Sequence, residues 1–207
     1  MPVSFLAAQL RRTGVTSAIP LMAGAAVALV GKAAAAAWSP VQAMALSFGL
    51  QQVFIICAGV SAAVAVTGDP LVELHEATPA TFRRVQLVRA AIATAFGVVG
   101  AVLMFAPLHL AGVWMHDKGW ITLLSPAGAV IVMAAAAFVA TAFTGAVSTT
   151  AIAVVTTWMF LAMLWDPYVE PLLFQRGVPV LAAGALAAFA WRRLGDAERN
   201  VSRAVTA

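Results

Sequence analysis

The pair His75-Glu76 is the first place where the residue types of this 207-residue chain could support metal chemistry. In zinc metalloproteases the pattern H-E-x-x-H places a second histidine one helical turn later, and both rings then bind the metal. The position that would hold the second histidine is Pro79. The pattern therefore fails at its second ligand.

The other reactive side chains are also poor candidates for catalysis. His109 and His116 are seven residues apart and are followed by Asp117, so an interfacial position explains them better than a metal site does. The single cysteine, Cys57, lies in the apolar run VFIICAGV, where a buried, inert thiol is expected. No G-x-S-x-G nucleophile elbow occurs in the sequence. We expect neither a metal site nor a catalytic residue in this chain.

Nucleotide hydrolysis is not expected either. A P-loop has the spacing G-x-x-x-x-G-K-[ST], and Gly31-Lys32 is the only pair that could end it. Ala26 and Ala33 stand where the first glycine and the hydroxyl residue are required.

The composition is that of an integral membrane protein. Hydrophobic residues make up 63% of the chain and charged residues 10%, against about 45–50% and about 25% in soluble domains. The mean hydropathy is +0.97. The net charge of +4 does not indicate nucleic-acid binding, because the basic residues lie at the ends of apolar runs and form no patch with aromatic residues.

Six apolar runs predict an all-α protein with six transmembrane helices, each of which needs about 20 mostly apolar residues. The runs cover residues 16–31 (extendable to 38), 41–66, 88–113, 121–143, 147–165 and 177–191. Thr144-Gly145-Ala146 predicts a tight turn between the fourth and fifth spans. No span has an acidic residue in its middle, which argues against an ion-coupled carrier. Residues 1–207 are expected to form a single transmembrane domain.

The basic residues predict the orientation. With both termini in the cytoplasm, nine of the twelve Lys and Arg residues lie inside, and only Lys32, Lys118 and Arg176 lie outside. This bias follows the positive-inside rule and requires an even number of spans. We expect a multi-pass protein of a bacterial plasma membrane, with a cytoplasmic tail over residues 192–207.

The first residues predict an interfacial helix ahead of the first span. It covers residues 4–13 and begins at Ser4, which can act as the N-cap. Its apolar face is Phe5, Leu6 and Leu10, and its polar face is Gln9, Arg11 and Arg12. Arg11 and Arg12 would hold this helix at the membrane surface.

The longest polar interruption is residues 68–85, GDPLVELHEATPATFRRV. Asp69-Pro70 is a strong helix start, and Thr78-Pro79 predicts the end of a helix of about two turns. Its apolar face carries Leu71 and Leu74, and its acidic face carries Glu73 and Glu76. This pattern predicts a short cytoplasmic helix on which a soluble partner docks.

Residues 68–90 resemble the cytoplasmic loop of ABC exporter permeases of the type-2 family, notably those of actinomycetes. The matching residues are Asp69-Pro70, Glu73-Leu74, Ala77-Thr78-Pro79, Arg83 or Arg84, and Arg89. In that family the loop holds the coupling helix, which seats in a groove of the ATP-binding subunit. Elsewhere in the chain the likeness is one of architecture.

The resemblance implies a permease subunit of an ATP-driven exporter. A separate ATP-binding cassette subunit would bind ATP and Mg, and a second permease, identical or different, would complete the translocation path. The residues implied to dock the ATP-binding subunit are Asp69, Leu71, Glu73, Leu74, His75 and Glu76. Arg83 and Arg84 would hold the loop to anionic lipid head groups. Residues 166–176, DPYVEPLLFQR, could form the extracellular re-entrant segment of the family.

A second interpretation stays open at this point. A non-transporting membrane anchor or assembly protein could recruit a soluble partner through the same cytoplasmic loop. It would have no partner permease and would stimulate no ATPase. The sequence leaves the substrate open, and the direction of transport rests on the resemblance.

Overall fold

The computed structural model describes residues 3–67 and 82–195, with side chains from residue 6 onward. These ranges contain helices and turns and no strand. The helices are α1 (Val3–Ala37), α2 (Pro40–Val66), α4 (Phe82–Leu110), η1 (Trp120–Leu123), α5 (Leu124–Thr144), α6 (Val147–Met159), η2 (Phe160–Trp165) and α7 (Leu172–Arg193). The short segment η1 is a 3-10 helix, and η2 is a π-helix that directly follows α6.

Six helical segments of the described chain are long and apolar enough to cross a membrane. They are Leu6–Ala37, Pro40–Val66, Phe82–Leu110, Trp120–Thr144, Val147–Trp165 and Leu172–Arg193. The prediction of an all-α protein with six such helices is confirmed. These helices fit a multi-pass membrane protein.

The predicted turn between the fourth and fifth spans is also confirmed. Gly145 follows α5 with a φ of 71°, and its N–H donates to the Thr141 carbonyl. A left-handed residue of this kind ends a helix without strain only where the side chain is absent. The chain can therefore reverse at once into α6.

The start of the chain differs from expectation, because α1 runs without interruption from Val3 to Ala37. Gln9 and Thr13 are buried, whereas Leu6 and Leu10 are exposed. Gln9 and Thr13 thus face the neighbouring helices, whereas Leu6 and Leu10 face outward, as the exposed Arg11 and Arg12 do. An interfacial helix over residues 4–13 that is separate from the first span is unconfirmed.

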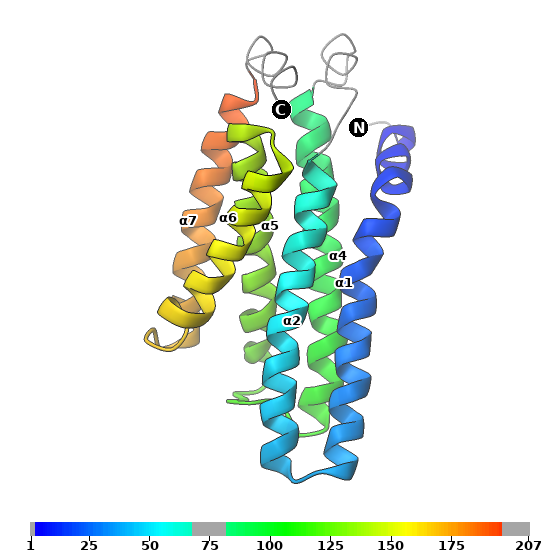
Figure 1. Cartoon of the computed structure of the whole chain (residues 1–207), viewed down its shortest axis with the longest axis vertical. Coiled ribbons are helices and arrows are strands. Elements are labelled where there is room, and N and C mark those ends of the chain that lie inside the picture. Colours follow the sequence, from blue (N-terminus) through cyan, green and yellow to red (C-terminus); the bar gives the residue numbers. More distant parts are fainter. Residues whose placement is uncertain (1–2, 68–81, 196–207) are drawn as a thin grey trace.

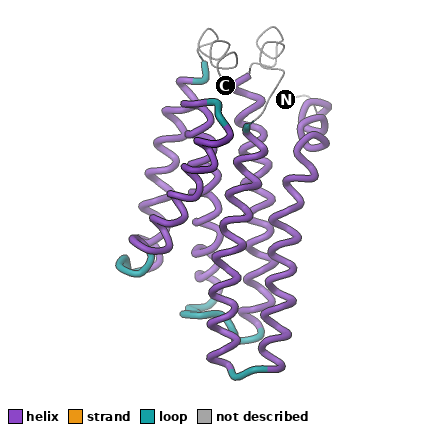
Figure 2. The backbone as a smooth tube through the Cα atoms, in the orientation of Figure 1, coloured by secondary structure: helices purple, strands orange, loops and turns teal. Residues whose placement is uncertain are grey.

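The helices form two groups that α5 joins (Figures 1 and 2). α1 packs against α2 and α4, while α5 packs against α2, α4, α6 and α7. Small residues permit the closest approaches: a Cβ on Gly24 would lie 2.2 Å from the Gly100 carbonyl oxygen, so α1 and α4 touch backbone to backbone. This contact holds α4, the helix that follows the predicted docking loop, firmly against α1.

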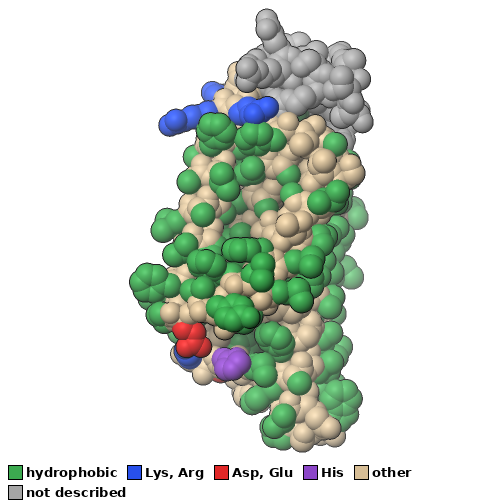
Figure 3. All heavy atoms as spheres, turned by 60° about the vertical axis from the view of Figure 1, so that its left-hand side comes forward, with side chains coloured by type: hydrophobic (Ala, Val, Ile, Leu, Met, Phe, Trp, Pro, Cys, Tyr) green, Lys and Arg blue, Asp and Glu red, His purple; other side chains and the backbone are tan. Residues whose placement is uncertain are grey.

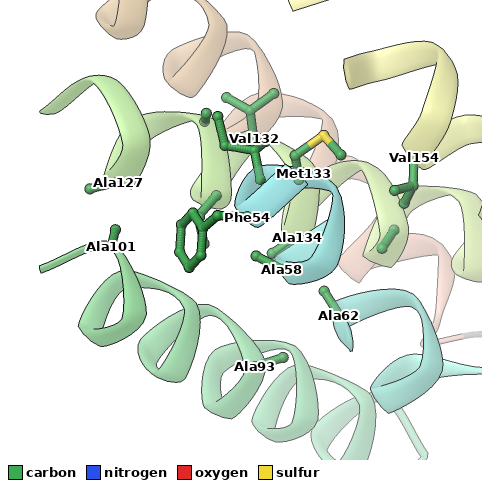
Figure 4. Close-up of a cluster of buried hydrophobic side chains, with 14 of the residues drawn as sticks. Phe54, Ala58, Ala62, Ala93, Ala101, Ala127, Val132, Met133, Ala134 and Val154 are labelled. Atoms are coloured by element: carbon green, nitrogen blue, oxygen red, sulfur yellow. The ribbon is translucent and has the colours of Figure 1, made fainter. Parts of the chain in front are cut away.

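The core lies where α2, α4, α5 and α6 meet (Figure 4). Phe54 of α2 is fully buried and points into the space between α4 and α5. Met133 of α5 packs toward Val154 of α6, and both would collide with a side chain at Gly59. Alanines of α2 and α4 fill the narrower places around Phe54.

The two ends of the bundle carry different charges. α1 begins and α7 ends at the same end, which we call the arginine end (Figure 1). Its described basic residues are Arg11, Arg12, Arg83, Arg84, Arg89, Arg192 and Arg193. The opposite end, which we call the carboxylate end, holds all the acidic residues of the described chain, namely Asp117, Asp166 and Glu170. Figure 3 shows both groups on one face, separated by hydrophobic side chains.

Candidate functional site

The predicted docking residues lie outside the described part of the chain. They are Asp69, Leu71, Glu73, Leu74, His75 and Glu76. The coupling helix is therefore unconfirmed, and the structure describes only the two points where the loop joins the bundle. These points are the end of α2 and the start of α4, both at the arginine end.

Both attachment points are firmly packed. Val66, the last residue of α2, is 1% exposed, and the N–H of Thr67 donates to the Ala63 carbonyl at 3.0 Å. Phe82, the first residue of α4, is buried, and Val85 one turn later is completely buried. A displacement of the loop ends would therefore move the packed helices α2 and α4 with it.

Arg83 links the start of α4 to the end of α7. Its guanidinium lies 4.9 Å from the ring centroid of Trp191. A second cation–π pair joins α7 to α5. In this pair the Arg193 guanidinium lies 4.3 Å from the Phe143 ring centroid. Cation–π contacts of this kind contribute about 0.5–2 kcal/mol each. They join three helix ends into one unit beside the loop.

The arginines predicted to lie at the membrane surface fall into two classes. Arg11, Arg12 and Arg84 are exposed, as a role at the surface requires. Arg83 is half-buried and packs on Trp191 of α7, and its role at the membrane surface stays a prediction.

A buried polar pair near the arginine end was not predicted. Arg89 Nε donates to Gln9 Oε1 at 2.9 Å, and the two residues are 2% and 7% exposed. Arg89 lies seven residues inside a membrane-crossing helix, and a charged residue at such a depth marks a functional or structural site. In the sequence, only the position of Arg89 within an apolar run pointed to such a site. Its partner Gln9 lies 80 residues away and could not be predicted.

A cavity of about 450 Å³ opens near the carboxylate end. Its polar lining comes from α2, from the segment before α5 and the start of α5, and from the turn between η2 and α7 and the start of α7. The polar and charged residues are Gln51, Gln52, His116, Lys118, Thr122, Ser125, Asp166, Glu170, Gln175 and Arg176, and the others are Phe48, Trp114, Met115, Ala162, Pro167 and Leu172. Its size is that of a small-molecule site, and its lining combines apolar residues with a majority of polar and charged ones.

An ion pair forms one wall of this cavity. Arg176 Nη1 and Nη2 donate to the two carboxylate oxygens of Asp166 at 2.7 and 2.6 Å, and Nη2 also contacts Ser125 Oγ at 3.3 Å. Arg176 is 5% exposed. Burial raises the pKa of the Asp166 carboxyl, and the hydrogen bonds and charge of Arg176 lower it to a smaller extent.

Further hydrogen bonds hold the turn that carries Asp166. Trp165 Nε1 donates to the Gln175 carbonyl, and Gln175 Nε2 donates to the Asp166 carbonyl, both at 2.7 Å. Residues 172–176, the second half of the predicted extracellular segment, are the first residues of α7. The two ends of the segment 166–176 are therefore hydrogen-bonded to each other, and both line the cavity.

The loop before η1 is held in a similar way. His109 Nδ1 lies 2.5 Å from Asp117 Oδ2, and Asp117 Oδ1 accepts from the Gly119 N–H at 2.8 Å. The His109 ring stacks on Phe105 and meets Trp120 edge-on. These contacts fix the backbone between two cavity residues, His116 and Lys118. In the described residues no three His, Cys, Asp or Glu side chains gather to hold a metal ion.

Comparison of the chain with protein-family models, with curated proteins and with solved structures found no match. Its function must therefore be argued from its own residues.

Proposed function

We propose that this chain is the membrane-spanning permease subunit of an ATP-driven ABC exporter. The observation that carries the proposal is the acidic loop with its helix start and stop signals, Asp69-Pro70 and Thr78-Pro79, between two membrane-crossing helices. A separate ATP-binding cassette subunit would dock on Leu71, Glu73, Leu74 and Glu76 and supply ATP and Mg.

The packing of the loop ends supports a role in transmitting force. α2 and α4 continue directly from the loop into the core, where both contact α5. Arg83 adds a contact from the start of α4 to the end of α7. Because closely packed helices move as units, a pull on the loop would shift α2, α4 and α7 together.

The charge distribution supports a cytoplasmic position of the loop. All described arginines except Arg176 lie at the end of the bundle where the loop attaches. Under the positive-inside rule this end faces the cytoplasm, where ATP is present. Glu73 and Glu76 would pair there with basic residues of the ATP-binding subunit.

A second permease copy or homologue is part of the proposal. In the apolar stretches of Val147–Trp165 and Leu172–Arg193 only 17% of the residues are buried inside one chain, against 56% in those of Pro40–Val66 and Trp120–Thr144. A single bundle therefore leaves two helices with most of their surface available to a partner permease or to lipid.

The proposal is tested by purifying the full chain from its native membrane in mild detergent and identifying co-purifying proteins by mass spectrometry. The test variant is the double charge reversal Glu73→Arg/Glu76→Arg. The matched control is Asp196→Arg/Glu198→Arg, which changes the net charge equally in the C-terminal tail. We expect an ATP-binding subunit with the wild type and the control, and its loss with the loop variant.

Two results would overturn the proposal. One is a chain that purifies alone or with a partner that cannot bind ATP, which would favour the membrane anchor or assembly protein. The other is an ATP-binding subunit that stays bound equally to the loop variant, which would place the docking surface elsewhere.

A further inference from the structure

The cavity near the carboxylate end contains polar groups that the bundle itself does not use. Gln51 is 7% exposed and lines the cavity, yet its carboxamide makes no hydrogen bond within the described chain. Its neighbour Gln52, by contrast, accepts from Trp158 Nε1 at 3.1 Å. Because Gln51 lines the cavity and its amide has no partner among the described residues, it is available to hydrogen-bond a ligand or water there.

Lys118 and Glu170 supply two further unused groups of opposite charge. Both side chains line the cavity, and neither forms an ion pair with another residue that the structure describes. The remaining charges, Arg176 and Asp166, neutralise each other through their two-pronged contact. Among the described residues the cavity therefore offers Lys118 as a cation and Glu170 as an anion without an ion-pair partner, and His116 adds a ring nitrogen.

The wall of the cavity is continuous with the outer apolar surface. Phe48 of α2 lines the cavity and is 47% exposed. Leu172 lines it from α7, and the next two residues, Leu173 and Phe174, are each 61% exposed. Figure 3 shows charged and histidine side chains near the lower end bordered by hydrophobic ones. A ligand could thus place a polar head in the cavity and an alkyl chain along the helices.

From these contacts we propose that the cavity binds the head group of a zwitterionic phospholipid. Lys118 and His116 bind the phosphate, Glu170 binds the ammonium group, and Gln51 hydrogen-bonds a polar atom deeper in the cavity. A purely anionic head group would leave Glu170 without a partner and close to like charge, and a purely cationic one would do the same to Lys118. The binding needs no ATP-binding subunit, so it does not depend on the exporter proposal.

The test measures lipid binding to the purified full chain in detergent by native mass spectrometry. Phosphatidylethanolamine and phosphatidylglycerol with identical acyl chains are titrated in parallel, and soluble phosphoethanolamine is added as a competitor without a tail. The variants are Lys118→Gln, Glu170→Gln and Gln51→Leu. The matched control is Lys32→Gln, because Lys32 is exposed near the same end but does not line the cavity.

We expect the wild type and Lys32→Gln to bind phosphatidylethanolamine more tightly than phosphatidylglycerol. Lys118→Gln should weaken both lipids about tenfold, the effect of one charge-assisted hydrogen bond. Glu170→Gln should remove the preference for phosphatidylethanolamine while leaving phosphatidylglycerol bound. Competition by phosphoethanolamine alone would show that the head group suffices, and its absence would show that the tail contributes.

Equal binding of the two lipids by the wild type would overturn the proposal. So would unchanged binding in both Lys118→Gln and Glu170→Gln. Because these two side chains are exposed, their replacement leaves the packed core intact, and a negative result cannot be attributed to misfolding.

Discussion

Arg89 of α4 and Gln9 of α1 are joined by a buried hydrogen bond of 2.9 Å between Nε and Oε1. The bond connects α4, the helix that follows the predicted docking loop, to α1. It also places a guanidinium inside a membrane-crossing segment, where such a group must be well solvated by protein atoms. Its loss should therefore be measurable in the stability of the whole bundle.

Replacing Gln9 by leucine should lower the free energy of unfolding by about 1–3 kcal/mol, because the buried Arg89 Nε then loses the Gln9 oxygen that accepts its hydrogen bond. Thermal unfolding in detergent, followed by circular dichroism, checks this. Gln9→Glu is the control, since it keeps an oxygen acceptor opposite the guanidinium. A leucine variant as stable as the wild type would show that the bond contributes nothing.

Gly100 should tolerate no side chain, because α1 and α4 meet there backbone to backbone. A Cβ on Gly100 would lie 2.5 Å from the Pro20 carbonyl oxygen. We expect Gly100→Val to destabilise the protein by about 1–3 kcal/mol or more through overpacking. Gly49→Val is the matched control, since nothing lies within 4 Å of a Cβ at that helical glycine. The comparison is made by thermal unfolding and by the yield of monodisperse protein.

Arg83 and Arg84 are adjacent, but they should differ in their effect on stability. Arg83 stacks on Trp191 and is half-buried, whereas Arg84 is exposed. Arg83→Gln should therefore lower the free energy of unfolding by about 0.5–2 kcal/mol, and Arg84→Gln should change it by less. If the two variants were equally stable in detergent, membrane-surface contact alone would explain both residues.

Removing Arg176 should destabilise the wall of the cavity. The Asp166 carboxylate would lose both of its hydrogen bonds from the guanidinium. Breaking a buried ion pair in this way costs about 3–5 kcal/mol, and we expect the lower limit because Asp166 keeps some exposure. Thermal unfolding of Arg176→Gln at neutral pH measures this loss. Lys118→Gln, which removes an unpaired charge nearby, should have little effect on stability.

The pH dependence of the same variant follows from the raised pKa of Asp166. A carboxyl whose pKa is higher in the folded protein contributes stability below its unfolded pKa, about 3.9, and loses that contribution as pH rises through the folded pKa. Arg176→Gln removes the influence that lowers this pKa. The difference in melting temperature between wild type and variant should therefore widen as the pH rises above about 4. A difference independent of pH would contradict this assignment.

The sequence by itself determined the fold class and most helix ends. Runs of apolar residues of sufficient length define membrane-crossing helices because each helix satisfies its own backbone hydrogen bonds. Gly145 marked the reversal between α5 and α6 because only a left-handed residue permits it. The start of α1 could not be predicted in the same way, since the burial of Gln9 depends on Arg89, a partner 80 residues away.

The predicted docking loop rests on signals in the sequence, whereas the cavity appears only in the structure. Helix start and stop signals act over a few neighbouring residues, so Asp69-Pro70 and Thr78-Pro79 could be identified without a fold. The cavity requires Gln51, Lys118 and Glu170 to converge from three distant segments. Only tertiary packing decides such a convergence, because side-chain partners across helices depend on how each helix is rotated and where its neighbours end.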